Sequence, residues 1–206
     1  MYNCIIFDID GTIIDTEKAV ISSLQRLLKA EMGKEYSADE LSFVLGIPGT
    51  IALQRLNVSD IYNANQKWNE YIKDYYGYIS VFPGLEDIIK KIHSKKIKTG
   101  IVTSKTKQEL IEDFYPFGLQ GYFDYIVCAD DTKRHKPEPE PILKCIELIK
   151  ADPCEIVYIG DTIYDMQCAD RAGIDFALAL WGTKSPGLNA KIKLRHPIEI
   201  LDVIHS

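Results

Sequence analysis

The chain has 206 residues, of which 46% are hydrophobic, and a formal net charge of −6. This length can bury one substantial core with an insertion, or two small cores. No apolar run approaches the roughly 20 residues of a membrane span, no secretory signal opens the chain and the basic residues are scattered, so we expect a cytoplasmic protein that binds neither membranes nor nucleic acids.

The first predicted element is a short buried strand at residues 4–7, which ends in two carboxylates, Asp8 and Asp10. In an extended chain the two side chains point the same way, and like charges held so close repel unless a cation intervenes. Mg²⁺ prefers such oxygen ligands. Gly11 permits a tight turn that leaves amide groups free to face an anion. An ordinary strand that stops in an Asp-Gly turn is the alternative.

Residues 15–80 show helical patterns and no strand. In order, we expect an amphipathic helix through Val20–Leu28 that ends near Gly33, a short helix from Ser37, a loop at Gly46–Thr50, and helices at 51–56 and 59–76.

From Pro83 onward, predicted helices and strands alternate. Helices are expected at 85–92, 107–114, 142–149 and 164–172, and strands at 99–102, 123–128, 156–159 and, as the last, 176–180. Such alternation predicts an α/β fold with a parallel sheet and helices on both faces. The first strand finds partners only after residue 80, so the helical block is an insertion. The five cysteines have no paired spacing and no recognisable catalytic partner, which predicts core residues in a reducing compartment.

Polar residues follow four of the predicted strands, and Asp8 and Asp10 after the first strand are one such group. Thr103 and Ser104 come after one strand, Lys136 after the next, and Asp161 and Asp165 after a third. Ligands bind outside the carboxyl ends of such strands, so these residues should share one rim with Asp8 and Asp10. Taken singly, Thr103 and Asp161 could be helix N-caps and Lys136 a solvated lysine.

This combination suits phosphoryl transfer. Asp8 would attack phosphorus, and Asp10 would protonate the leaving oxygen and later activate water. Mg²⁺, held by Asp8, the backbone carbonyl of Asp10 and Asp161, would neutralise phosphate charge. Lys136 and Thr103 would bind the remaining phosphate oxygens.

The segment Asp8-Ile9-Asp10-Gly11-Thr12, followed by Thr103, Lys136 and Gly160-Asp161 with Asp165, resembles the four motifs of the haloacid dehalogenase superfamily. The helical insertion is similar to that of the phosphoglycolate phosphatase-like branch. The resemblance implies a Rossmann-like core of residues 1–14 and 81–206 and an all-helical cap of residues 15–80. It also implies catalytic roles for Asp8, Asp10, Thr103 and Lys136, and metal binding by Asp8, Asp10, Asp161 and Asp165. The dehalogenases that name the superfamily lack the second aspartate, so Asp10 points to a phosphotransferase.

Substrate contacts are expected from Gly11, Thr12 and Ser104 in the core and from Gly46 and Arg55 in the cap, although Arg55 could equally lie on a solvated helix face. Asp130, Asp131, the run from Lys136 to Pro141, Trp181 and Gly182 also resemble a group of bacterial pyrophosphatases.

We therefore expect a Mg²⁺-dependent phosphatase of small phosphorylated metabolites, acting as a monomer or homodimer. Phosphoglycolate is the first candidate substrate and pyrophosphate the second. One alternative is a phosphomutase of the β-phosphoglucomutase type, which needs a cap cation for a second phosphate. A catalytically idle regulatory module is the other.

Overall fold

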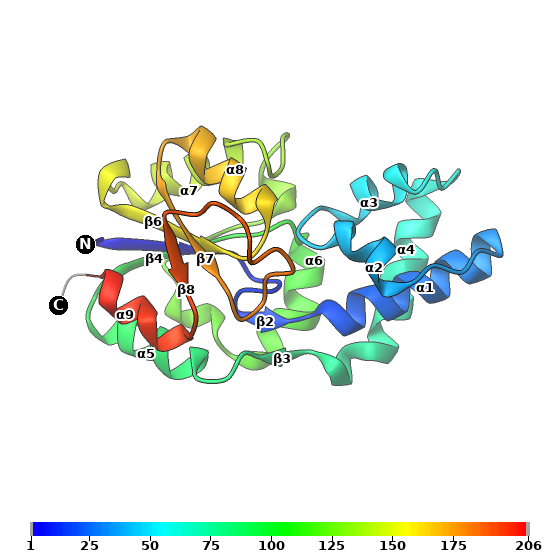
Figure 1. Ribbon diagram of the computed structural model, residues 1–206, viewed down its shortest axis with the longest axis horizontal. Coiled ribbons are helices and arrows are strands. Elements are labelled where there is room, and N and C mark those ends of the chain that lie inside the picture. Colours follow the sequence, from blue (N-terminus) through cyan, green and yellow to red (C-terminus); the bar gives the residue numbers. More distant parts are fainter. Residues whose placement is uncertain (1, 205–206) are drawn as a thin grey trace.

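The computed structural model describes residues 2–204 (Figure 1). A parallel sheet with helices on both faces forms the larger part, which we call the core, and helices α1–α4 form a smaller part beside it, which we call the cap. The predicted α/β fold with an inserted helical part is confirmed. Over the described residues, no helix combines the length and the apolar character needed to cross a membrane.

The core sheet has six strands in the order β5-β4-β1-β6-β7-β8, and every neighbouring pair is parallel. The strands are β1 (Cys4–Phe7), β4 (Lys98–Val102), β5 (Tyr125–Val127), β6 (Ile156–Gly160), β7 (Asp175–Ala179) and β8 (Ile192–Leu194). β1 lies inside the sheet, where Cys4 pairs with Lys98 on one side and Ile156 on the other.

The two faces of the sheet carry separate apolar clusters, because side chains of a strand alternate between faces. Ile5 and Phe7 join the cluster under α5 (Leu85–Ser94) and α9 (Ile200–Val203). Cys4 and Ile6 join the cluster under α7 (Glu140–Ile149) and α8 (Ile163–Ala172). An entirely apolar β1 is therefore what a strand covered on both faces requires.

The cap has its own cluster of buried apolar side chains, separate from those of the sheet. Its helices are α1 (Glu17–Met32), α2 (Ala38–Leu41), α3 (Gly49–Arg55) and α4 (Ile61–Tyr71). Leu24, Leu27 and Leu28 of α1 are fully buried in this cluster, as their spacing predicted. Gly33 ends α1 in the left-handed conformation, and a capping box at Ser37 starts α2, both as expected.

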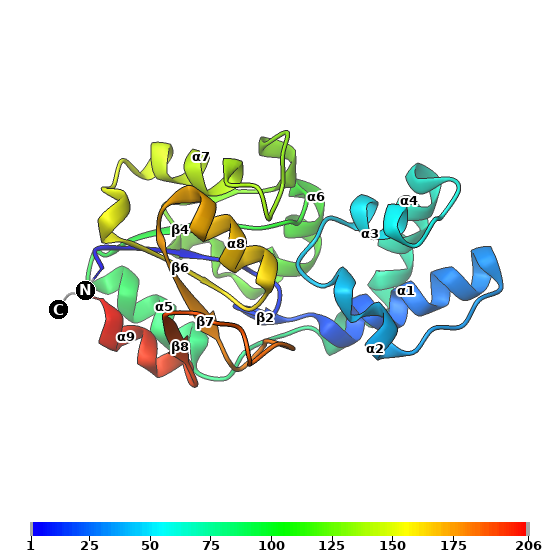
Figure 2. The ribbon, with the colours of Figure 1, turned by 45° about the horizontal axis from the view of Figure 1, so that its top comes forward.

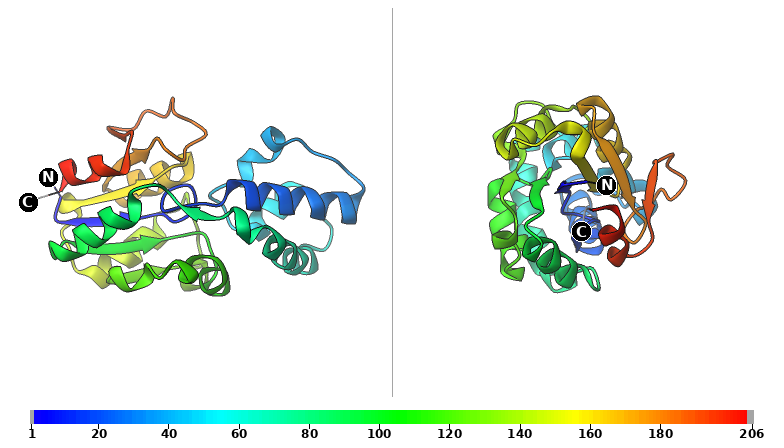
Figure 3. Two further views of the ribbon diagram at one scale, coloured as in Figure 1. Left: turned by 90° about the horizontal axis from the view of Figure 1, so that it is seen from below. Right: turned by 90° about the vertical axis from the view of Figure 1, so that its left-hand side faces the viewer.

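A two-stranded antiparallel ribbon joins cap and core. β2 (Ile14–Asp15) carries the chain out and β3 (Ser80–Val81) brings it back beside β2 (Figure 3). The expectation of no strand within residues 15–80 is therefore wrong at both ends. Strands of two residues contain no alternation, so no sequence period could reveal them.

Other elements differ from expectation in extent. The helix expected at 59–76 is shorter and continues as a 3-10 segment (Ile72–Tyr78), and the one at 107–114 consists of α6 (Lys107–Glu109) and a π-type turn (Leu110–Phe114). The sequence interpretation missed β8, which has three residues, only one of them fully enclosed, and so lacks the long apolar run of the interior strands. Short 3-10 turns occur at Ser42–Val44, Tyr115–Phe117, Gln120–Tyr122, Ala129–Asp131, Pro153–Glu155 and Pro197–Glu199.

Candidate active site

The predicted site residues gather at one edge of the sheet, where β1, β4 and β6 end. Asp8 directly follows β1, Thr103 follows β4 and Asp161 follows β6. Lys136 arrives from the segment between β5 and α7, and its Nζ lies 2.7 Å from Asp8 Oδ1. The carboxyl edge of a parallel sheet is where ligands bind in this architecture. Residues spread over most of the chain therefore meet at one place.

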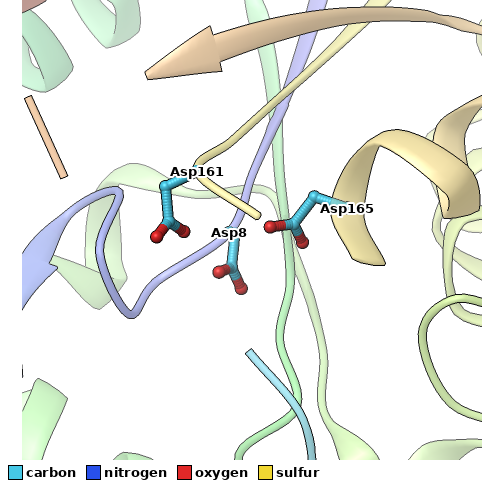
Figure 4. A group of neighbouring side chains, drawn as sticks. All are labelled: Asp8, Asp161 and Asp165. Atoms are coloured by element: carbon cyan, nitrogen blue, oxygen red, sulfur yellow. The ribbon is translucent and has the colours of Figure 1, made fainter. Parts of the chain in front are cut away.

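Three carboxylates converge there. Asp8, Asp161 and Asp165 each offer an oxygen, and these oxygens lie within 4.8 Å of one another; we call this group the three-aspartate cluster. Figure 4 shows the side chains pointing toward one another from the ends of two strands and the first turn of α8. All three are buried. Asp8 Oδ2 is buried and has no hydrogen-bond partner among the described residues, which leaves that oxygen for a ligand or a reacting atom.

Lys136 binds the cluster from one side. Its ammonium donates to Asp8 Oδ1 and Asp165 Oδ1, both at 2.7 Å, and to the Tyr158 hydroxyl at 3.0 Å. The side chain is 1% exposed, so the alternative of a solvated lysine is wrong. Burial opposes the charge of Lys136, but the carboxylates of Asp165 and Asp8 outweigh it and raise its pKa. Lys136 is therefore a fixed positive charge at neutral pH.

The cluster carries more negative charge than the protein neutralises. Burial raises the pKa of Asp8 to about 7, against the opposing effect of Lys136 and with the help of Asp165 and Asp10. Burial, followed by Asp165 and Asp8, raises the pKa of Asp161 well above its usual range. When all three carboxylates are ionised, the single ammonium of Lys136 leaves two negative charges uncompensated, which is why protonation is favoured in the absence of a cation. A divalent cation with a preference for oxygen ligands, such as Mg²⁺, fits both the charge and the donor set.

The start of α8 fixes Asp165. The Asp165 amide donates to Thr162 Oγ1 at 3.2 Å, and Asp165 Oδ2 accepts from the Thr162 amide at 3.0 Å. This capping box leaves Asp165 Oδ1 for Lys136. Gly160 supplies the space, because a Cβ there would lie 2.6 Å from that of Asp165. Thr162, and not Asp161, is the N-cap of α8, so the N-cap alternative for Asp161 is wrong.

Asp10 lies on the cap side of the cluster, and its side chain is not one of the three convergent carboxylates. Its Oδ1 accepts from Thr16 Oγ1 at 2.7 Å and lies 2.9 Å from Lys105 Nζ. Lys105 Nζ also lies 2.6 Å from Asp113 Oδ2. Burial opposes the charge of Lys105, but Asp10 and Asp113 outweigh it and raise its pKa. Asp10 is thus held in a defined direction by a hydroxyl and an ammonium.

The turn after β1 uses the amides of Gly11 and Thr12 internally, so for these two the expectation of amides free to face an anion is wrong. The Gly11 amide donates to the Ile14 carbonyl at 2.8 Å and the Thr12 amide to the Ile9 carbonyl at 3.2 Å. Gly11 has a φ of +75°, and a Cβ there would lie 2.2 Å from Asp161 Oδ2. Thr12 Oγ1 is 3.4 Å from Asp161 Oδ1. Both residues shape the surroundings of Asp161.

The predicted substrate contacts from the cap fall in two places. The loop between α2 and α3 reaches the core (Figure 2), where the Ser104 hydroxyl donates to the Gly46 carbonyl at 3.0 Å. Arg55 on α3 instead donates to the hydroxyl of Tyr164 on α8 at 2.8 Å, with its guanidinium 5.5 Å from the ring centre. Ser104 and Gly46 therefore border the cleft between cap and core, whereas the described contacts of Arg55 lie on α8.

Sequence reasoning missed three residues of this site: Lys105, Tyr158 and Thr16. Lys105 looks like any lysine beside a helix start, and its burial depends on partners from two other segments. Tyr158 stands inside an apolar strand, yet its hydroxyl lies 2.9 Å from Asp165 Oδ1 and 3.1 Å from the Val102 carbonyl. A buried tyrosine usually finds a partner for its hydroxyl, and that is the only sequence signal it carried.

Phosphoryl-transfer enzymes use a nucleophilic carboxylate together with a lysine and a divalent cation that neutralise phosphate charge. This site combines an unpartnered carboxylate oxygen, a charged lysine and a cluster that fits such a cation. That is the class of protein that the site defines. The haloacid dehalogenase-like hydrolase family matches residues 5–179 of the sequence. The chain belongs to this family and is an enzyme of the hydrolase class.

Individual relatives agree with this assignment. A phosphoglycolate phosphatase of Aquifex aeolicus is 33% identical over 184 residues, which cover 86% of this chain and 84% of the relative. A protein provisionally named pyrophosphatase PpaX, from Caldanaerobacter subterraneus subsp. tengcongensis, is 32% identical over 178 residues, 86% of this chain and 81% of the relative. The solved structure of a Lactobacillus plantarum protein, provisionally named a phosphoglycolate phosphatase, superposes with a TM-score of 0.90 at 26% identity and covers 99% of this chain and 100% of that one.

Proposed function

We propose that this chain is a Mg²⁺-dependent phosphomonoester hydrolase that works through an aspartyl-phosphate on Asp8. One observation carries the proposal: Asp8 Oδ1 is fixed by Lys136 at 2.7 Å, while the buried Oδ2 has no partner among the described residues. A carboxylate held by one oxygen presents the other for attack on phosphorus, which splits the hydrolysis into two easier steps.

The neighbouring side chains fit the remaining tasks. Lys136 and Thr103 bind oxygens of the transferred phosphate; Thr103 Oγ1 accepts from the Lys105 amide at 3.2 Å, so its own proton is free to point at such an oxygen. Asp10 protonates the leaving oxygen and then takes a proton from the water that hydrolyses the intermediate. Acid–base help of this kind is typically worth about 10²–10⁴ in rate.

The three-aspartate cluster and the backbone carbonyl of Asp10 would hold the Mg²⁺. When bound, the ion neutralises phosphate charge and allows an anionic nucleophile to approach. The two negative charges that Lys136 leaves uncompensated support a divalent ion at this place.

The cap, with proposed limits at residues 15 and 80, covers the site and moves against the core about the β2–β3 ribbon. Closing excludes bulk water from the reacting groups, and opening admits substrate. We propose Ser104 and the loop at Gly46 as substrate contacts, with Arg55 as a further cap residue near the boundary. The substrate is a small phosphorylated metabolite, and the names of the relatives make phosphoglycolate and pyrophosphate the first to test.

The test is release of inorganic phosphate from p-nitrophenyl phosphate and a panel of phosphorylated metabolites, with Mg²⁺ and with EDTA. We expect turnover with Mg²⁺ and its loss on chelation. A folded, Mg²⁺-loaded protein that hydrolyses nothing on the panel would refute the proposal and favour a regulatory module.

A further inference from the structure

Two cavities meet beside Asp10. One has a volume of about 90 Å³ and extends between cap and core, and the other, of about 240 Å³, opens toward the loop after β7. Both are lined by Asp10, Thr16, Leu45 and Gly46, so they are two arms of one cleft. If Asp10 protonates the leaving oxygen, as the proposed function has it, the organic part of the substrate must lie in this cleft.

The smaller arm is rich in carboxylates. Asp10, Glu109, Glu112 and Asp113 line it, against a single cation, Lys105. The ammonium of Lys105 lies 2.9 Å from Asp10 Oδ1 and 2.6 Å from Asp113 Oδ2. The charge of Lys105 is therefore already balanced by two carboxylates. A further anionic group of a substrate that entered this arm would be repelled by the remaining carboxylates.

The larger arm also has more acidic than basic residues in its lining. Its acidic residues are Asp10, Asp15, Glu17 and Asp161, and its cation is Lys184. Lys184 Nζ lies 2.5 Å from Glu17 Oε2. Setting Asp161 aside for the metal still leaves more carboxylates than ammonium groups. In neither arm does the described lining contain a cation without a carboxylate partner.

Cations outside the lining leave an excess of carboxylates. Lys73 Nζ lies 3.8 Å from Glu112 Oε1, but it also lies 2.9 Å from Glu70 Oε1, so its one charge is shared between two carboxylates. Lys136 is committed to Asp8 and Asp165, and in the proposed reaction it serves the transferred phosphate. Arg55 does not line either arm; it lies against Tyr164 on α8.

The rest of the smaller arm is largely apolar, with Thr16, Asn69, Tyr76 and Ser104 as its uncharged polar residues. Six hydrophobic side chains, all from residues 15–80, line it: Val20, Val44, Leu45, Ile47, Trp68 and Ile72. Such a wall favours carbon over charge because an ion there loses hydration without gaining a partner.

We infer that the preferred substrates are phosphomonoesters whose leaving group is small, partly aliphatic and uncharged or cationic. This inference rests on the proposed function and narrows it. A leaving group with a second anionic centre, such as the carboxylate of phosphoglycolate or the second phosphate of pyrophosphate, is repelled by both arms. The specificity named in the relatives therefore does not carry over to this chain.

The test compares esters that differ in charge but not in size: 2-phosphoglycolate, its uncharged amide and O-phosphoethanolamine, all at saturating free Mg²⁺. We expect kcat/KM for the amide and for phosphoethanolamine to exceed that for phosphoglycolate by about tenfold or more, and the gap to narrow as salt screens the carboxylates. Equal or faster hydrolysis of phosphoglycolate or pyrophosphate would overturn the inference and leave the proposed function intact. Failure to hydrolyse any ester, p-nitrophenyl phosphate included, would overturn both.

A substitution in the cleft gives a second readout. Glu112 Oε2 accepts from Tyr76 Oη at 3.1 Å, and Glu112 Oε1 accepts from Gln108 Nε2 at 2.6 Å. In Glu112→Gln the amide oxygen can keep the bond from Gln108, and the amide NH₂ can donate to the Tyr76 hydroxyl, while the charge is lost. We expect the ratio of kcat/KM for phosphoglycolate to that for the amide to rise about threefold or more. The matched control is Glu86→Gln on α5, an exposed residue paired with Lys90 outside the cleft, which should leave the ratio unchanged. An unchanged ratio in Glu112→Gln would count against a role for these charges.

Discussion

Asp8 meets two requirements that usually conflict in a nucleophilic carboxylate. It must be held still, which Lys136 does through Oδ1 at 2.7 Å, and it must keep an oxygen free, which the unpartnered Oδ2 does. Lys136 in turn is held by Asp165 and Tyr158, so the orientation of Asp8, the proposed nucleophile, depends on side chains from three other positions in the chain.

Asp8→Asn should reduce kcat with p-nitrophenyl phosphate by at least about 10³, because an amide is neither a usable nucleophile nor a good metal ligand. The fold should survive, since the amide keeps the shape of the side chain. Steady-state kinetics and circular dichroism measure the two effects. The exposed Asp87→Asn on α5 is the control and should behave as the parent. Activity of Asp8→Asn within tenfold of the parent would remove Asp8 from its role as nucleophile.

At the level of residues, the sequence predicted the positions of those site residues that come directly after a strand. Asp8, Thr103 and Asp161 each come directly after a strand, so their convergence followed from the parallel sheet alone. Lys105 could not be found in this way. Its burial against Asp10 and Asp113 is a property of packing between segments, which no local pattern records.

At the level of elements, β6 and α8 together bring Asp161 and Asp165 to the proposed cation site. Burial raises the pKa of Asp8 from the ordinary 3.8 to about 7, so between these values the metal-free folded chain binds a proton that the unfolded chain has lost. Its free energy of unfolding should therefore fall as pH rises from about 4 to about 7. Binding of Mg²⁺ displaces that proton and should stabilise the fold more at pH 8 than at pH 6.

Thermal unfolding with and without Mg²⁺ at the two pH values tests this expectation. Activity should disappear with EDTA and return with Mg²⁺. Ca²⁺ should also raise Tm yet support little turnover, because it takes more oxygen ligands at longer distances than Mg²⁺. Full activity after exhaustive chelation, or an equal Mg²⁺ effect on Tm at both pH values, would contradict a cation at this cluster.

Helices α3 and α8 meet across the boundary between cap and core through Arg55 and Tyr164. If Arg55 acts through this contact, Arg55→Ala and Tyr164→Ala should each change kcat/KM by less than about fivefold, and the double variant should show no further change. Kinetics of the four proteins in this cycle give the coupling. Additive effects, or a loss of a hundredfold in Arg55→Ala alone, would instead assign Arg55 to the substrate.

The elements that the sequence predicted well are those with a long enough period. α1 and α5 carry apolar stripes over several turns, and β1 and β6 are unbroken runs of buried, mostly apolar residues. The β2–β3 ribbon and β8 are fixed instead by the backbone of a partner strand, at Val81, Ser80 and Ala177–Ala179. A segment of two or three residues is a strand because it pairs with the backbone of its partner, and its own side chains do not predict it.

At the level of the whole molecule, the charge of the cleft separates a hydrolase from a mutase. A mutase must retain a doubly phosphorylated intermediate while it reorients, and an arginine fork is the favoured grip for the second phosphate. The loop at Gly46–Thr50 contains no basic residue, and Arg55 lies against Tyr164.

We therefore expect stoichiometric release of inorganic phosphate from any good substrate and no isomerised sugar phosphate. The measurement is ³¹P NMR with β-glucose 1-phosphate, supplemented with its 1,6-bisphosphate. Glucose 6-phosphate that forms faster than free phosphate would establish a mutase and make Arg55 the next residue to substitute.

The place of β1 in the sheet also sets the order in which the chain can fold. β1 is synthesised before the other strands of its sheet, and its partners at Lys98 and Ile156 follow only after the entire cap. At about 5–20 residues per second the apolar tetrapeptide Cys4–Phe7 waits on the order of ten seconds for its second neighbour. The cap, whose contacts are nearer in sequence, can assemble in that interval, whereas pairing over such separations is intrinsically slow. Asp8, the proposed nucleophile at the end of β1, therefore acquires its surroundings late in folding, and until then the apolar strand before it has no partner to cover it.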